Sequence, residues 1–281
     1  MPRWIALFRG INVGGNNLLP MKKLVRHFEA LKLKNVRTYI QSGNVVFDTD
    51  EKNAKSLAKK ITQRIEREHG FGPQVLLISR EDLQNAIRAN PFGTLVTLTD
   101  QGLDANHIPF EIDPDPAPFG TLRGHVARAN PVWRELAHPD VLAIFHGPHT
   151  YISPSWYPSA QENRKAVPTW NYVVVHAHGA IAIIDDATWV RAQLERLVIR
   201  FESSRANPWR VSDLPADYVE TMVRGVVGFE VPVARLIGKW KVSQNRPEGD
   251  VHGIVDGLHA AGTDADLDMA QLVRDARTDL K

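Results

Sequence analysis

The chain has 281 residues, 43% hydrophobic and 23% charged, a balance that indicates a folded protein and excludes a disordered one. It holds no cysteine, which excludes disulfides, thiolate nucleophiles and thiolate metal sites. No stretch approaches the about 18 unbroken apolar residues of a membrane span, and the first residues lack an apolar signal. We therefore expect a cytoplasmic protein without a membrane partner.

The net charge of +2 conceals two halves of opposite sign. Residues 1–80 hold 15 Lys and Arg against 6 Asp and Glu, net +9, and the remainder holds 19 against 26, net −7. Together with the length, this predicts a domain of residues 1–80 and a second of residues 81–281. Only the first is expected to suit a phosphate-rich surface.

The first domain begins with an apolar run over residues 4–9, followed by a Gly/Asn loop and a stretch over 21–31 with helical spacing. Two β-branched runs, 36–41 and 44–49, are separated by Ser42 and Gly43, which predicts a hairpin. A helix over 53–69 and a strand over 74–79 complete the order strand, helix, strand, strand, helix, strand. This order is the ferredoxin-like arrangement.

Two strings in this domain, LFRGINVGG (7–15) and TYIQSGNVVF (38–47), resemble the signatures of a widespread family of uncharacterised bacterial proteins. The resemblance covers the family's first half and implies a fold, not an activity. The glycine loop could bind an anion or simply turn the chain. The helices carry cations that could contact DNA or form solvated faces, namely Lys22, Lys23, Arg26, Lys55, Lys59 and Lys60.

The second domain is rich in predicted strands. After a short helix from residue 81, strands cover 93–100 and 103–113 with a turn at Gln101 and Gly102. Further strands follow over 122–129, 140–153, 170–185 and 227–243. Asn130 is the expected N-cap of a helix starting at Pro131, and helices are expected over 186–203, 216–224 and in the C-terminal tail. The strands are not regularly interleaved with helices, which favours a small barrel with peripheral helices in an α+β protein.

Five successive motifs carry a second resemblance: GTLVTLTDQGLDANHIPF, LRGHVARANPVW, YISPSWYPS, VPTWNYVVVHAHG and GKWKVSQNR. In order, over residues 82–265, they resemble the PaiB-like family of FMN-binding negative transcriptional regulators. The resemblance implies a split β-barrel, similar to pyridoxamine-phosphate oxidases and flavin reductases, that forms a homodimer with FMN at the subunit interface.

The flavin would need cationic or amide donors for its phosphate and apolar surface for its ring. His125 and Arg128 stand three apart, so a regular strand places them on opposite faces. By analogy Arg128 with Asn130 could hold the phosphate while His125 faces the ring, although packing or a surface salt bridge explains them almost as well. Asn106 and His107 end a strand that in related barrels runs beside the flavin; hairpin-end hydrogen bonding is the alternative.

The turn KWKVSQNR is the densest group of donors, with Lys239, Lys241, Gln244 and Arg246 as candidates for the phosphate. A solvated strand end is the alternative. Ser155, Trp156 and Trp170 border proline-containing loops, where aromatic residues are frequent at flavin rims and at dimer interfaces.

The sequence indicates no metal site. His146 with His149 and His176 with His178 are possible pairs, but no acidic third ligand is evident nearby. No nucleophile elbow accompanies the Ser and His residues, so the catalytic residues are unknown and an enzyme is the less favoured interpretation. The expected function is negative regulation of transcription, the alternative an FMN-dependent oxidoreductase. The second domain lacks a helix-turn-helix pattern and is acidic, so DNA contact is expected only through the basic first domain.

Overall fold

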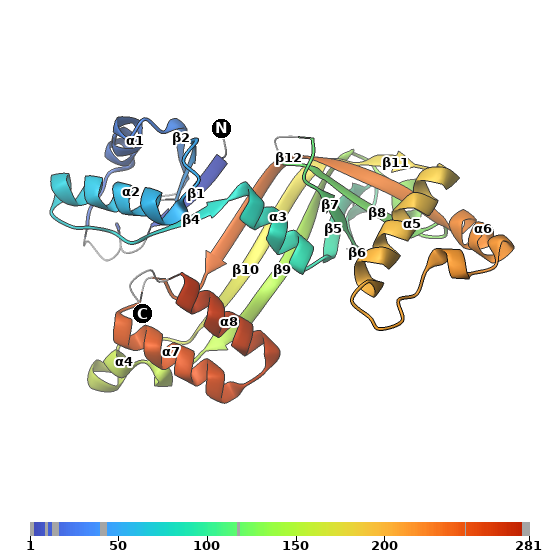
Figure 1. The fold of residues 1–281 in the computed structure, drawn as a ribbon. Coiled ribbons are helices and arrows are strands. Elements are labelled where there is room, and N and C mark those ends of the chain that lie inside the picture. Colours follow the sequence, from blue (N-terminus) through green and yellow to red (C-terminus); the bar gives the residue numbers. More distant parts are fainter. Residues whose placement is uncertain are drawn as a thin grey trace. The chain divides into compact units, whose positions relative to one another are not determined.

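The structure, a computed structural model, describes residues 3–8, 11–12, 17–39, 44–116, 119–244 and 246–276. The chain divides into two compact units (Figure 1). Unit 1 comprises Met1–Leu83, Pro148–Val173 and Trp240–Lys281, and unit 2 comprises Gln84–Gly147 and Val174–Lys239. Three long strands pass from one unit into the other, namely β9 (Asp140–Ile152), β10 (Thr169–Ala180) and β12 (Val226–Lys241). No helix of the described ranges is long and apolar enough to cross a membrane.

The N-terminal part of unit 1 is a four-stranded antiparallel sheet with two helices. Its elements are β1 (Arg3–Phe8), α1 (Met21–Ala30), β2 (Lys34–Tyr39), β3 (Asn44–Asp48), α2 (Ala54–His69) and β4 (Val75–Ser79). The strand order β2-β3-β1-β4, with antiparallel neighbours throughout, is that of a ferredoxin-like fold. The predicted fold of this region is confirmed, while the predicted turn at Ser42 and Gly43 and most of the glycine loop lie outside the described residues.

Helical periodicity explains how α1 and α2 pack on this sheet. Leu24 and Phe28 of α1, and Leu57, Ile61 and Ile65 of α2, recur at spacings of three or four and join one buried core. The ends of α2 are set locally. Asn53 accepts a hydrogen bond from the Ser56 amide, and Gly70 takes the left-handed conformation at φ 73°.

Unit 2 contains most of an antiparallel sheet in the order β6-β5-β9-β10-β12-β8-β7, with β11 (Ala182–Ile184) paired to β12. The remaining strands are β5 (Phe92–Thr99), β6 (Gly102–Pro109), β7 (Glu111–Asp113) and β8 (Thr121–Ala127). Because β6 also contacts β8, the sheet curls back on itself as in a split barrel. Its interior holds three edge-to-face phenylalanines, Phe110, Phe145 and Phe229, all buried.

Helix α5 (Ala187–Glu202) contacts β8, and α6 (Ala216–Arg224) packs against α5; helix α3 (Arg80–Ala89) precedes β5 in the chain. The predicted α+β class with a split barrel is confirmed. The predicted helix after Asn130 is wrong in length, because the chain forms only the 3₁₀ turn Pro131–Trp133, although the Asn130 side chain does cap it by accepting from the Val132 amide.

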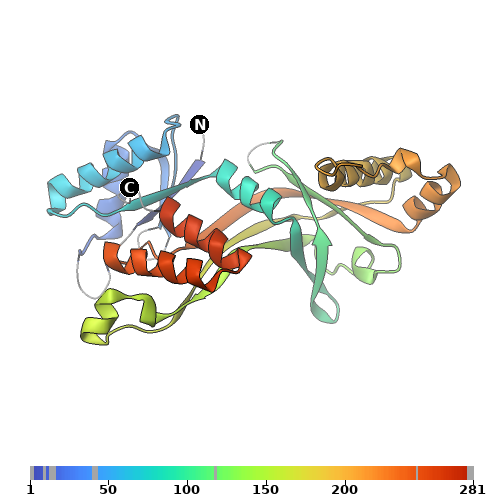
Figure 2. The same cartoon turned by 60° about the horizontal axis from the view of Figure 1, so that its bottom comes forward.

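The C-terminal part of unit 1 is a helical cluster made of α4 (Pro158–Asn163), α7 (Glu248–Ala261) and α8 (Asp264–Asp275). Helices α7 and α8 lie side by side (Figure 2). Their buried residues pack with Ile152, Tyr157 and Val173 in a core of their own. Helices α7 and α8 are the predicted helical tail, whereas α4 lies in a proline-containing segment for which no helix was predicted.

Candidate functional site

One face of the unit 2 sheet is apolar and open. The register of β5 against β6 places Leu98 opposite Leu103 and Val96 opposite Ala105. Leu98 is 42% exposed and Leu103 is 81% exposed, and Phe92 on the same face is 66% exposed. Large apolar side chains gathered on one sheet face, instead of scattered singly, indicate a surface that a partner or ligand covers.

The same face continues onto β9, β10 and β12, where its chemistry changes. Ile144 of β9 pairs with Thr94 and so lies on this face, and Val174 alternates with buried neighbours on β10. Beyond them stand His176 and His178 of β10, and Arg235 of β12 lies 3.1 Å from His178 (Nη2 to Nδ1). Apolar surface therefore adjoins imidazole and guanidinium groups.

Burial lowers the pKa of both His176 and His178. His146 and then Arg235 lower the pKa of His176 further, and Arg235 followed by His176 does the same for His178. Both rings are therefore neutral at neutral pH, able to donate from one nitrogen and accept at the other. Arg235 supplies the permanent positive charge of this face.

Asn106 and His107, adjacent on β6, face opposite sides of the sheet. Asn106 pairs with the buried Leu95, and its Oδ1 accepts from Nδ2 of Asn130 at 2.6 Å. His107 pairs with Thr94 on the open face, is exposed, and has its ring 6.3 Å from that of Phe92. Of these two candidates, His107 thus shares the apolar face, and Asn106 joins Asn130 in hydrogen bonds within the protein.

His125 and Arg128 of the β8 region both contact other parts of unit 2. His125 Nδ1 lies 2.8 Å from Oε1 of Gln193 on α5, and burial lowers the pKa of this histidine. Arg128 forms a bidentate pair with Asp185 at 2.6 and 2.9 Å and also donates to the carbonyls of Arg224 and Val226. That Arg128 holds a phosphate stays a prediction, and the guanidinium would have to leave Asp185 to do so.

Ser155, Trp156 and Trp170 lie in unit 1. Trp156 fits against two glycines of α7: a Cβ at Gly257 would stand 2.3 Å from its indole, and one at Gly253 would stand 1.9 Å from its carbonyl oxygen. Trp156 is thereby fixed by packing. Trp170 is 54% exposed and meets the Tyr151 ring edge-on, whereas the hydroxyl of Ser155 hydrogen-bonds that of Ser153 at 2.7 Å.

The donor side chains at the end of β12 contact different groups near them in the chain or in space. Lys239 is exposed, whereas Lys241 donates from Nζ to the Thr169 hydroxyl. Gln244 accepts from the Val242 amide and donates to the Trp240 carbonyl, which closes the turn. The Arg246 guanidinium lies over the ring of Tyr157, 4.3 Å from its centroid.

The structure also shows site residues that the sequence analysis missed. Arg235 did not stand out, and His176 and His178 were considered only as metal ligands. The signal was available, because His176 and His178 alternate with the apolar Val175 and Ala177 along one strand. A further buried pair, Asn171 with Ser243, forms a 2.9 Å hydrogen bond between β10 and the turn after β12.

A curled antiparallel sheet with an apolar, histidine-lined outer face defines a split-barrel protein. Sequence comparison agrees: the family described as "Putative FMN-binding domain" matches residues 73–235, and "Protein of unknown function (DUF1697)" matches residues 1–118. The chain belongs to this FMN-binding family, as its PaiB-like motifs predicted, and FMN is the family's cofactor.

Two relatives at 35% identity support the assignment. The protease synthase and sporulation protein PAI 2 of Bacillus subtilis is 35% identical, with 69% of this chain and 91% of that protein covered. An uncharacterised protein of Emericella nidulans is also 35% identical, with the same coverage. Among solved structures, the FAD and heme binding protein of Mycobacterium smegmatis has a TM-score of 0.45 at 18% identity, covering 66% of this chain and 78% of that one.

The residues of the open face fit FMN. Its isoalloxazine ring needs apolar surface, which Ile144 and Val174 supply, and its ring edge needs donors and acceptors, which neutral His176 and His178 supply. Its phosphate needs a cation, and Arg235 provides one. The donor set therefore matches the cofactor of the family.

Proposed function

We propose that this protein binds FMN on the open face of unit 2 as a homodimer and regulates transcription in response to the flavin. The apolar face that begins at Leu98 and Leu103 and ends at His178 and Arg235 carries the proposal. Exposed leucines at its start favour a second copy of the chain as cover, since water contact with such a patch is costly. FMN supplies reversible electron-accepting chemistry when bound.

Different residues of this face would contact different parts of FMN. Arg235 would neutralise the phosphate, and His178, already bonded to it, would orient the guanidinium. The predicted ligands His107 and Lys239 belong to the same unit and could add donors. Ser155, Trp156, Trp170, Lys241, Gln244 and Arg246 remain predictions as flavin contacts.

The proposal is tested by titrating the purified chain with FMN and following flavin fluorescence. Arg235→Gln removes a charge-assisted hydrogen bond and is expected to weaken FMN binding about tenfold or more. Arg191→Gln is a matched control, because Arg191 is an exposed α5 residue whose contact is with Glu195 four residues on. Equal affinity of the R235Q variant and the natural chain would exclude the open face as the phosphate site.

The regulatory part of the proposal needs a DNA-contacting surface, and the exposed lysines of α2 offer one. Lys55 and Lys59 are exposed on a helix whose opposite face forms the core. Retention on duplex DNA is expected to fall with salt, and Lys55→Gln with Lys59→Gln is expected to make the dependence on salt shallower. A control variant replaces Arg191 and Arg224 of unit 2 with glutamine. If it makes the dependence of DNA retention on salt shallower by the same amount, a role for α2 is contradicted.

The reductant that bound FMN accepts electrons from distinguishes a regulator from the alternative function, an oxidoreductase. Under anaerobic conditions, rapid bleaching of the flavin by NADH or NADPH would support the enzyme. Bleaching by dithionite alone would support the regulator.

A further inference from the structure

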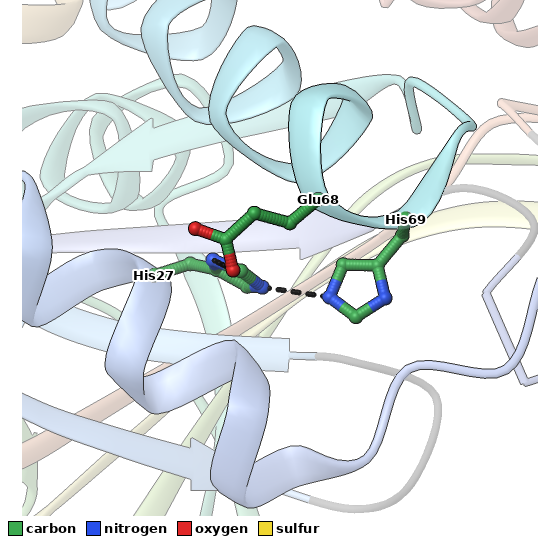
Figure 3. A group of neighbouring side chains, drawn as sticks. All are labelled: His27, Glu68 and His69. Atoms are coloured by element: carbon green, nitrogen blue, oxygen red, sulfur yellow. Dashed lines mark hydrogen bonds and ion pairs between the residues drawn. The ribbon is translucent and has the colours of Figure 1, made fainter.

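Three side chains of the ferredoxin-like region form a cluster that flavin binding does not use (Figure 3). His27 comes from α1, and Glu68 and His69 are the last two residues of α2. The two histidine Nε2 atoms are 2.9 Å apart, and Glu68 Oε2 lies 3.7 Å from His27 Nδ1. One ligand atom of each residue lies within 4.8 Å of the other two, and in the ranges described no other group of this kind occurs.

The cluster arises from the packing of the two helices. His27 lies between Leu24 and Phe28 on the buried face of α1 and is 3% exposed. On α2 the buried positions Ile61 and Ile65 continue at the same helical spacing to Glu68 and His69. The helices thus place a buried imidazole where the core of this region would accept an apolar residue, and a buried polar ring needs partners.

The electrostatics of the cluster prepare His27 to act as a ligand. Burial lowers the pKa of His27, the Glu68 carboxylate raises it, and His69, Arg64 and Lys23 lower it again. The net effect of these groups is to lower the pKa of His27. A neutral imidazole is the form that binds metals.

Glu68 is held with one oxygen turned toward His27. Arg64, four residues earlier on α2, binds Oε1 of Glu68 at 2.6 Å and leaves Oε2 facing the imidazole. The Glu68 side chain is 46% exposed, so water can reach this side of the cluster. Two nitrogens and one carboxylate oxygen with a solvent-accessible side match the donor set of a four-coordinate zinc ion with water in the fourth position.

We propose that His27, Glu68 and His69 bind one Zn²⁺ ion that ties the end of α2 to α1. Two nitrogens bound to zinc at about 2.0–2.1 Å in tetrahedral geometry stand about 3.3 Å apart. The present separation of 2.9 Å has to widen by about 0.4 Å on binding. His69 can supply this movement, because it is the final residue of its helix and is followed by the left-handed Gly70.

Binding also requires a lone pair on both Nε2 atoms. The 2.9 Å contact in the metal-free pair is a hydrogen bond in which one Nε2 carries a proton. That proton moves to the Nδ1 of its own ring when the metal takes its place. The alternative to a metal site is this hydrogen-bonded pair alone, which would hold the helices without any ion.

The test is a titration of the chelator-treated 281-residue chain with Zn²⁺ against a chromophoric chelator, with Co²⁺ as a spectroscopic substitute. The expected result is one equivalent of bound metal, visible absorption of four-coordinate Co²⁺, and a rise in the thermal unfolding midpoint with zinc. His69→Gln is expected to weaken zinc binding by more than tenfold, and Glu68→Gln by about tenfold.

Two controls identify the site. Glu66→Gln changes an exposed carboxylate of the same helix and should leave zinc affinity unchanged. The pair His176→Gln and His178→Gln removes two histidines of β10 that lie outside the cluster and should also leave zinc affinity unchanged. Unaltered affinity in H69Q with native circular dichroism, loss of binding in the double variant, or no stoichiometric binding by the natural chain would each overturn the proposal.

Discussion

His125 Nδ1 lies 2.8 Å from Oε1 of Gln193, which joins strand β8 to helix α5 through a half-buried imidazole and a buried amide. An amide oxygen only accepts, so Nδ1 of His125 carries the proton. Gln193 is fully buried, so its side of this bond is shielded from water.

We expect Gln193→Leu to lower the free energy of unfolding by about 1–3 kcal/mol, because it leaves the half-buried Nδ1–H group of His125 without its acceptor. The double variant His125→Leu with Gln193→Leu should recover much of the loss, since both polar groups are then gone. Urea denaturation of the single and double variants measures the coupling. Strictly additive losses would show that the two side chains act independently.

Stability should decrease on acidification. Burial is the leading cause that lowers the folded-state pKa of His27, His125, His176 and His178, so below about pH 6.5 the unfolded chain binds protons that the folded chain excludes. The stabilisation is complete above this pH and is lost as the pH falls toward the lowered pKa values. His125→Gln keeps a polar side chain but cannot titrate, and should make the decline shallower. His259→Gln, at an exposed position, is the control, and an equal change in both would contradict the role of His125.

Gly257 of α7 should not tolerate alanine, although alanine is the better helix former. The added Cβ would stand 2.3 Å from the indole of Trp156, and the expected cost is about 1–3 kcal/mol of unfolding free energy. Gly249 of the same helix has nothing within 4 Å of its Cβ position, so Gly249→Ala is the matched control and should be neutral or stabilising. Thermal unfolding of both variants is the measurement. A lower midpoint for Gly257→Ala alone shows that packing against Trp156 outweighs helix propensity, and similar midpoints for the two variants would contradict this.

Leu103→Lys should convert the proposed homodimer into monomers, because it places a charge among the exposed leucines at the start of the apolar face, opposite Leu98. Leu18→Lys changes a leucine that is 67% exposed in the ferredoxin-like region and should have no such effect. Light scattering coupled to size exclusion gives the mass of each variant. A monomeric natural chain would refute the dimer.

Local sequence patterns predicted the elements well. Spacing alone located the helices at 186–203 and 216–224, observed as Ala187–Glu202 and Ala216–Arg224. The βαββαβ order also followed from periodicity, because each element encodes its own buried face.

Side-chain pairing was not predictable in the same way. Arg128 meets Asp185, and His27 meets His69, across 57 and 42 residues of sequence. Such pairs depend on strand register and helix packing, which a periodic pattern does not specify. For the same reason, Arg128 looked available for a phosphate in the sequence although the fold engages it with Asp185.

The fit of Trp156 against α7 has an evolutionary consequence. With a tryptophan at 156, positions 253 and 257 can hold only glycine, whereas a smaller residue at 156 would relax the constraint at 257, where a side chain makes the contact. Homologous chains should therefore exchange these residues in a correlated way. Position 253 should remain glycine in either case, because there the contact is with the backbone.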